Sequence, residues 1–188
     1  MHTSRCPKPV YGAGVDDVAY ITSLIEEARN RYTISSVSLI GHSNGAYMSH
    51  RFACDRAEWI DAIASIAGST WEDESLCAPK DTVRVVQIHG SEDESVLYDG
   101  VSGGLSYPSA PETVARWAKH NGCDATAKAQ VDEDFSLDVQ GSETEVFVHE
   151  NCAPGGHAEL WHVRGDGHLP AFNDAWRTRV LDHLLLEP

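Results

Sequence analysis

The sequence predicts an α/β fold, in which flanking helices cover a mostly parallel sheet. Short apolar runs alternate along the chain with segments of helical periodicity, the pattern expected of parallel strands joined by helices. One such run stops directly at a Gly-x-Ser-x-Gly pattern, residues 41–45. At 188 residues with 41% hydrophobic content, the chain is long enough to bury one core, so we expect residues 1–188 to form one domain.

The first half of the chain supplies three strands and two helices. Residues 15–32 have apolar side chains at helical spacing and predict a helix. The apolar run within 35–41 predicts a strand, and 44–54 predicts the helix after it. The segment 59–69 ends in a second strand, and 82–90 forms a third.

The second half adds two helices and a pair of strands. Residues 109–123 begin with Ser and Pro signals and end at Gly122, as a helix does. Residues 143–152 and 158–165 predict two strands joined by the turn Ala-Pro-Gly-Gly-His. The final apolar pattern, 170–187, predicts a closing helix.

The charge of the chain argues against nucleic acid and membrane partners. Fourteen Lys and Arg residues stand against 29 Asp and Glu, a formal net charge of -15, which repels nucleic acid and anionic lipid. No apolar run approaches the roughly 20 residues of a membrane span, and no signal peptide is visible at the start. A neutral or carbohydrate-like substrate fits this surface better.

Ser43, in the Gly-x-Ser-x-Gly pattern, is the candidate nucleophile. A serine between a buried strand and a helix sits on a strained turn, and small flanking residues let the strand and helix approach. The N-terminus of the helix lies behind it and favours developing negative charge. The alternative is a glycine-rich turn without catalytic function.

A serine hydroxyl needs a base and an orienting carboxylate. His168 lies in a small-residue loop after the last strand, a placement that no other of the ten histidines shares. Asp93 follows the strand that ends at Gly90, and both loops leave the carboxyl ends of strands. We predict His168 as the base and Asp93 as the acid, with Asp166 and Glu92 as the competing carboxylates.

Several ordered motifs resemble one known family. The segments GHSNGAYMSHRFAC, QIHGSEDESVLYDG, YPSAPETVARWAKHNGC and RGDGHLPAF are similar to the poly(3-hydroxybutyrate) depolymerase and feruloyl esterase group of the α/β-hydrolase superfamily. The resemblance implies Ser43, Asp93 and His168 as the triad of a serine carboxylic-ester hydrolase, with the backbone N–H of Asn44 in the oxyanion hole. It implies short-chain, hydroxycinnamoyl or polyhydroxyalkanoate-type esters as substrates, no metal or organic cofactor, and a secreted or periplasmic protein.

The chain also departs from that family. Family members carry several strands before the helix that begins near Val15, so we expect a domain shortened at its N-terminus. The strand edge at residues 36–40 would then be unpaired, an aggregation hazard unless something covers it. We expect a homodimer that pairs through this edge. The alternative to an active esterase is a non-catalytic or weakly active remnant that serves as a binding domain.

Loop aromatics near the carboxyl edge of the sheet are the candidate substrate contacts. Trp71 follows the second strand, and Tyr98 and Tyr107 flank the Gly- and Ser-rich loop 94–110. His42 is included because it precedes the nucleophile, although its side chain is not expected to face the Ser43 hydroxyl. The alternative for Trp71 is core packing.

Five cysteines without a Cys-x-x-Cys pair argue against a zinc ribbon and fit two disulfides with one cysteine left over. Cys123 ends a helix and Cys152 ends a strand that must pack nearby, a placement that is also similar to one in the family. We expect Cys123–Cys152 as one bridge and Cys54–Cys77 as the other, with Cys6–Cys54 as the competing pair.

Overall fold

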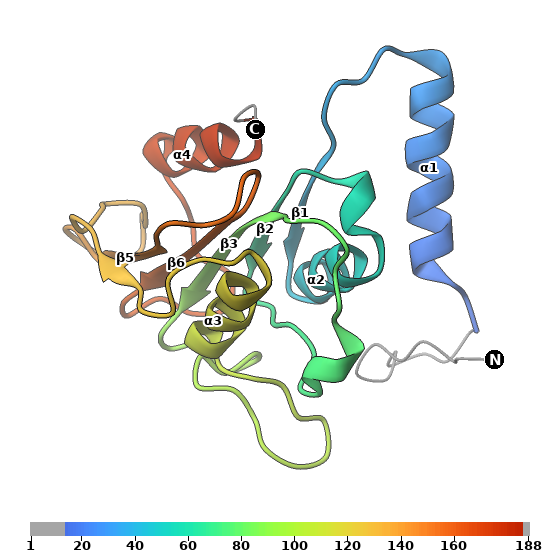
Figure 1. The fold of residues 1–188 in the computed structure, drawn as a ribbon. Coiled ribbons are helices and arrows are strands. Elements are labelled where there is room, and N and C mark those ends of the chain that lie inside the picture. The colour runs from blue at the N-terminus through green and yellow to red at the C-terminus, as the bar shows by residue number, and fades with distance from the viewer. Residues whose placement is uncertain (1–13, 186–188) are drawn as a thin grey trace.

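The structure, a computed structural model, describes residues 14–185 (Figure 1). Its centre is a six-stranded sheet with the strand order β1-β2-β3-β6-β5-β4. The strands are β1 (Ser38–His42), β2 (Ala62–Ile66), β3 (Arg84–Gly90), β4 (Lys128–Ala129), β5 (Thr144–His149) and β6 (His157–Val163). The predicted α/β fold class is confirmed.

The sheet is parallel in the half that carries the sequence motifs. Strands β1, β2, β3 and β6 run parallel, whereas β5 and the short β4 are antiparallel to their neighbours. The helices are α1 (Asp17–Arg31), α2 (Asn44–Arg56), α3 (Ala110–His120) and α4 (Asp174–Leu185). Every predicted helix and strand is present, and β4 is the strand that the sequence did not indicate.

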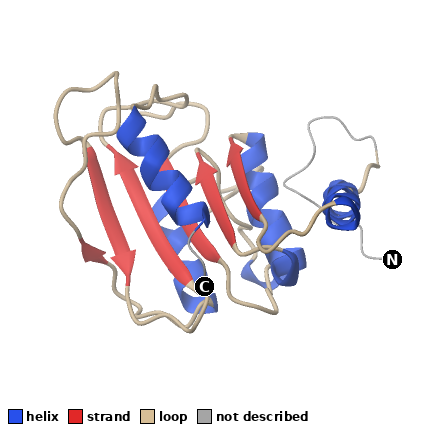
Figure 2. Cartoon of the chain, turned by 90° about the horizontal axis from the view of Figure 1, so that it is seen from above, coloured by secondary structure: helices blue, strands red, loops and turns tan. Residues whose placement is uncertain are grey.

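Helices cover the sheet on both faces, so each face has its own core (Figures 1 and 2). One core joins α2 and α3 to the sheet and includes Phe52, Trp117 and Leu160. The other joins α4 to the opposite face and includes Trp161 and Val180. Alternate residues of β6, such as Leu160 and Trp161, enter opposite cores, as the period of a strand requires.

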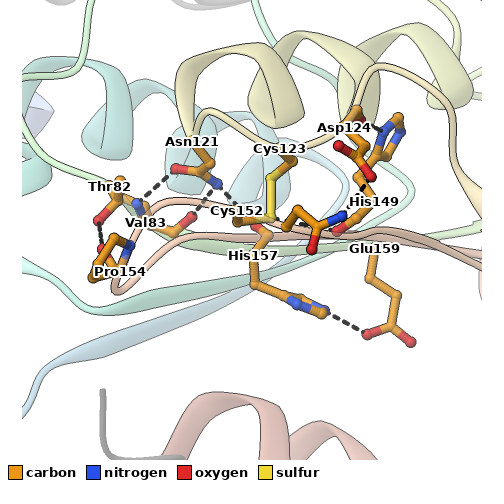
Figure 3. The surroundings of a disulfide bond; sticks show 11 residues. Thr82, Val83, Asn121, Cys123, Asp124, His149, Cys152, Pro154, His157 and Glu159 are labelled. Carbon is orange, nitrogen blue, oxygen red and sulfur yellow. Dashed lines mark hydrogen bonds and ion pairs between the residues drawn. A yellow bond between two sulfur atoms is a disulfide. The ribbon is translucent and has the colours of Figure 1, made fainter.

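Both expected disulfides are present. Cys54 of α2 is bonded to Cys77, and Cys123 is bonded to Cys152. Figure 3 shows the second bridge between the segment after α3 and the turn that joins β5 to β6. Cys6 lies outside the described residues. Among the helices within residues 14–185, none has the length and apolar character to cross a bilayer.

Helix α1 stands apart from the sheet, beyond α2 (Figures 1 and 2). Asp16 caps its N-terminus by accepting a hydrogen bond from the backbone N–H of Ala19. Only Val18 and Ile25 among its residues are buried, and both belong to the first core. The helix is therefore attached along a narrow apolar stripe.

Strand β1 is at the edge of the sheet, and β2 is its one neighbour within residues 14–185. Ile40, in the middle of β1, is 53% exposed. The expected pairing of two copies through residues 36–40 stays a prediction, and it can be tested because a lysine on an edge strand opposes pairing with another strand.

We expect Ile40→Lys to convert a dimer to a monomer in light scattering, with unchanged circular dichroism. Leu181→Lys on α4, at a site that is also 53% exposed, is the matched control and should leave the dimer intact. A monomeric wild-type chain at micromolar concentration would contradict the prediction.

Candidate active site

The turn between β1 and α2 places Ser43 in a strained backbone conformation. Its φ of 54° and ψ of -118° are sparsely populated for a residue with a side chain. The backbone N–H of Ser43 donates to the carbonyl of Ile66, and the N–H groups of Ala46 and Tyr47 donate to the carbonyl of Ser43. These bonds fix the turn on both sides, so its strain is held in place by the sheet and the helix.

Close packing at this turn depends on two glycines, and only one of them belongs to the motif. A Cβ at Gly41 would lie 2.2 Å from the carbonyl oxygen of Gly45, and a Cβ at Gly68 would lie 2.4 Å from the Cβ of Ala46. A Cβ at Gly45 would meet no atom within 4 Å. The expectation that both flanking glycines permit the approach is therefore right for Gly41 and wrong for Gly45, and Gly68 after β2 supplies the second close approach.

Ser43, His168 and Asp93 come together at the carboxyl end of the sheet. The Nε2 atom of His168 lies 3.0 Å from the hydroxyl oxygen of Ser43. The Nδ1 atom of the same ring lies 2.8 Å from Oδ2 of Asp93. The three residues follow β1, β6 and β3, so three separate strand ends position one continuous chain of hydrogen bonds.

Asp93 is held as a buried carboxylate, with 3% of its surface exposed. Its Oδ1 accepts hydrogen bonds from the backbone N–H groups of Ser95 and Val96, each 2.8 Å long. Burial alone would raise the pKa of Asp93, but the hydrogen bonds from His168, Val96 and Ser95 outweigh it and hold the pKa below its usual value. Asp93 is therefore ionised at neutral pH and faces the imidazole with a full negative charge.

The competing carboxylates point elsewhere. Oδ2 of Asp166 accepts a 2.7 Å hydrogen bond from the hydroxyl of Ser136, and its Oδ1 accepts from the backbone N–H of Gly167. Glu92 is exposed, and its backbone N–H donates to the carbonyl of Asp166. Asp166 therefore shapes the loop that carries His168, whereas Asp93 contacts the ring.

His42 is turned toward the His168 loop. Its Nε2 lies 2.7 Å from the backbone carbonyl oxygen of His168, so this nitrogen carries the proton and donates it. The two rings also pack against each other, with centroids 4.8 Å apart. These contacts make His42 a support for the position of His168, and the substrate contact expected of it stays a prediction.

Trp71 packs against the first core. Its backbone carbonyl accepts a 2.6 Å hydrogen bond from the guanidinium of Arg116 on α3. This position agrees with the core-packing alternative, and a contact between Trp71 and substrate stays a prediction.

Tyr107 and Tyr98 lie in different surroundings. Tyr107 packs edge-on against Tyr47 of α2, four residues after Ser43, with ring centroids 5.9 Å apart. Burial, with Tyr107 and Asp93 nearby, raises the pKa of Tyr47 well above its usual value. Tyr47 lies in the predicted helix 44–54, one turn after Ser43, and residues at this spacing are expected on the same side of a helix, which is the signal that could have indicated it.

Tyr98 borders an apolar hollow of about 240 Å³ over β5, β6 and α3. Its ring stacks on His162, with centroids 4.4 Å apart, and meets His89 edge-on at 5.7 Å. Burial raises the pKa of Tyr98 to about 12, with Glu145 and Asp99 adding to the shift. Whether Tyr98 or Tyr107 contacts substrate stays a prediction.

A buried chain of hydrogen bonds runs behind the site. The indole N–H of Trp117 donates to Nδ1 of His50, so Nε2 of His50 carries the proton and donates to the amide oxygen of Gln87. The amide nitrogen of Gln87 donates to Nδ1 of His89, whose Nε2 donates to the carbonyl of Val96. Each donor meets an acceptor, so the imidazoles of His50 and His89 are both neutral. This series of hydrogen bonds ends at Val96, in the loop that carries Asp93.

No family model matches the chain. A protein of Nocardia uniformis subsp. tsuyamanensis named "Putative esterase NocK" is 28% identical over 88 residues, which are 46% of this chain and 26% of that protein. The match thus spans about a quarter of the length of this curated relative.

Solved structures resemble the fold as a whole. Acetyl xylan esterase from Aspergillus awamori matches with a TM-score of 0.56 and 16% identity, over 89% of this chain and 67% of that one. A variant of SOBER1 from Arabidopsis thaliana matches with a TM-score of 0.58 and 12% identity, over 94% of this chain and 66% of that one. Esterase PE8 matches with a TM-score of 0.55 and 17% identity, over 89% of this chain and 60% of that one. With the sheet order and the helices on both faces, these likenesses show an α/β-hydrolase fold.

The buried, neutral His50 makes stability depend on pH. Burial lowers its pKa to about 4, against about 6.5 in an unfolded chain. Between these values the unfolded chain binds more protons, so the free energy of unfolding falls as the pH is lowered from about 6.5 to about 4. Across this pH range His50 changes the free energy of unfolding by on the order of 3 kcal/mol, and the protein has the full benefit only above a pH of about 6.5.

Denaturant unfolding at pH 7 and pH 4.5 checks this prediction. His50→Gln removes the titrating ring while its amide can still accept from Trp117 and donate to Gln87. We expect a smaller loss of stability between the two pH values in the variant than in the wild type. Equal losses in both proteins would contradict the assignment of a neutral His50.

Proposed function

We propose that the chain is a serine carboxylic-ester hydrolase in which Ser43, His168 and Asp93 act as a catalytic triad. The observation that carries the proposal is the continuous contact from the Ser43 hydroxyl through both nitrogens of His168 to the carboxylate of Asp93. Ser43 is partly exposed, so a substrate carbonyl can reach its oxygen, whereas Asp93 is buried behind the ring. The esterases among the structural neighbours and NocK support the same reaction class.

In the proposed reaction each of the three residues has a step. The Ser43 oxygen attacks the ester carbonyl carbon while Nε2 of His168 takes the hydroxyl proton. The imidazolium is stabilised by the ionised Asp93, and it then gives its proton to the leaving alcohol as the acyl-enzyme forms. Water, deprotonated by the same ring, attacks the acyl carbon and releases the acid and free Ser43.

The first turn of α2 is the proposed source of oxyanion stabilisation. Asn44 is the first residue of α2, and the first N–H groups of a helix have no acceptor within the helix. The backbone N–H of Asn44 can therefore donate to the developing oxyanion, and the helix dipole adds to this effect. No metal or cofactor takes part in these steps.

The substrate class is proposed from the resemblance and the composition of the chain. Short-chain, hydroxycinnamoyl or polyhydroxyalkanoate-type esters fit a protein with a net charge of -15 because such substrates carry no phosphate group. Leu169, which directly follows His168, is 75% exposed and offers an apolar surface next to the base. The two disulfides form in oxidising compartments, which supports a secreted or periplasmic protein.

Two other functions compete with this proposal. A weakly active or non-catalytic binding domain of the same fold would keep the arrangement of Ser43, His168 and Asp93 but would hydrolyse esters slowly or not at all. Peptide hydrolysis or acyl transfer would use the same triad on another acyl substrate. The second alternative is separated from ester hydrolysis by comparing p-nitrophenyl esters with peptides and alcohol acceptors.

Hydrolysis of a p-nitrophenyl short-chain ester tests the triad. We expect Ser43→Ala and His168→Ala each to lower kcat on the order of 10⁴-fold or more, and the double variant to be scarcely worse, because the residues act as a unit. Asp93→Asn should also be severe because the correct tautomer of His168 loses its acceptor. Equal rates for wild type and Ser43→Ala would remove the esterase proposal.

Asp166→Asn is the matched control for Asp93→Asn, because it makes the same change at the competing carboxylate. Its amide oxygen can still accept from Ser136, and Asp166 lies outside the contact with the His168 ring. We expect a mild loss of kcat. A loss larger than that of Asp93→Asn would show that the acid has been assigned to the wrong residue.

His42 gives a further test of how His168 is held in position. His42→Phe removes the donor to the His168 carbonyl, so we expect kcat to fall about 5-fold, the cost of roughly 1 kcal/mol of lost hydrogen bonding. His42→Gln keeps an N–H donor and should recover part of the rate. An increase in KM with unchanged kcat in both variants would instead make His42 a substrate contact.

A further inference from the structure

Two histidines and a glutamate form a cluster at the amino end of the sheet, where the proposed reaction does not use them. His157 and Glu159 come from β6, and His183 comes from α4. One ligand atom from each residue lies within 4.8 Å of the other two. Glu159 and His183 are 3% and 6% exposed, so the cluster is largely closed to solvent.

The two carboxylate oxygens of Glu159 have separate partners. Oε1 accepts a 2.7 Å hydrogen bond from the indole N–H of Trp161 and lies 3.4 Å from the guanidinium of Arg179. Oε2 faces Nε2 of His157 at 2.8 Å. One oxygen is thus anchored by groups that fix the carboxylate, and the other is directed at an imidazole nitrogen.

The tautomer of His183 is also fixed. Its Nε2 lies 3.2 Å from the backbone carbonyl of Ile63, and a carbonyl can only accept, so Nε2 carries the proton. The lone pair of the neutral ring is then on Nδ1. Histidines that bind metals usually donate their other ring N–H to a carbonyl or carboxylate in this way.

His157 is held at its backbone. The side-chain amide of Asn121 donates to the carbonyls of Val83 and His157, and Cys123–Cys152 ties the preceding turn to the end of α3. Figure 3 shows the side chains of His157 and Glu159 pointing to the same side of the sheet. The ring of His157 lies 5.6 Å from that of His183 across the gap to α4, centroid to centroid.

We propose that His157, Glu159 and His183 form a binding site for one divalent transition-metal ion of the zinc type. Two imidazoles and a carboxylate are a donor set that zinc accepts, with bonds of about 2.0–2.2 Å. The ion would take the place of the proton between His157 and Glu159. Tetrahedral bonds of this length hold ligand atoms about 3.4 Å apart, so ligand atoms 4.8 Å apart would have to close by about 1.4 Å. The cluster has three ligands within residues 14–185, which leaves the fourth position to water.

Local and global charges act in opposite directions on such an ion. Arg179 lies beside Glu159, and Nε of Arg84 lies 3.4 Å from the backbone carbonyl of His183, so both guanidinium groups oppose a cation. The side chain of Arg179 is 48% exposed and can turn into solvent. The carboxylate and the net charge of -15 favour binding.

The site is remote from the triad. His157 is paired with Arg84 at the first residues of β6 and β3, whereas Asp93 and His168 follow the last residues of these parallel strands. Seven strand residues separate the two ends, roughly 20 Å. The ion would therefore join α4 to β6 and stabilise the fold, without contact with the reacting ester.

Zinc binding to the full chain, freed of metal with a chelator, tests the proposal. We expect equilibrium dialysis against micromolar zinc chloride to find one tightly bound ion per chain, and the melting temperature to rise with zinc concentration. His157→Gln, at the half-buried position, should weaken binding at least tenfold and abolish the rise. Cobalt in place of zinc should give the visible absorption of a four-coordinate site in wild type and lose it in this variant.

His162→Gln is the matched control because it removes another histidine–glutamate pair from β6, the one with Glu145 at 2.8 Å. It should bind zinc as the wild type does, and so should His168→Ala, which excludes binding at the triad. Equal binding by wild type and His157→Gln, or no binding by folded wild type, would overturn the proposal. Neither result bears on the esterase assay, which does not depend on this site.

Discussion

The backbone of Ser43 is the constraint on which the site depends. A positive φ at a residue with a side chain costs on the order of 1–3 kcal/mol and persists only where its surroundings impose it. Here the surroundings are the Ile66 carbonyl on one side and the first turn of α2 on the other. The first turn of α2 can lie this close to the ends of β1 and β2 because residues 41 and 68 lack a side chain. The position of the partly exposed Ser43 is thus a product of the packing of β1, β2 and α2.

The buried polar chain from Trp117 to Val96 gives the opposite side of the site its rigidity. It crosses the first core from α3 through α2 to β3, and each of its neutral groups has a partner. A polar group buried without a partner costs about 1–3 kcal/mol, so loss of one member would penalise the others. The hydrogen-bonded side chains that fill the core therefore also fix the loop in which Asp93 accepts from two backbone N–H groups.

The sequence predicted the order of the helices and of every strand except β4, because each of these apolar runs has a clear period and clear turn signals, whereas β4 has two residues. The turn at Ser43 was also predictable, since glycine spacing between a strand and a helix is a local pattern. The choice between Asp93 and Asp166 was harder, because both lie in loops at strand ends. In the structure Asp93 contacts the ring of His168, whereas Asp166 accepts a hydrogen bond from Ser136, which lies in a segment without periodicity. Contacts such as His42 with the His168 carbonyl depend on how distant loops meet, and no local pattern encodes them.

The narrow attachment of α1 divides the chain into parts of unequal stability. With Val18 and Ile25 as its buried side chains, α1 can separate from α2 while the sheet stays intact. Its amide protons would then exchange with deuterium through local opening, whereas those of β3, buried at every residue, would exchange only when the whole sheet unfolds. A free energy measured by global denaturation would describe the sheet and its two cores, and it would overstate the energy that holds α1 in place.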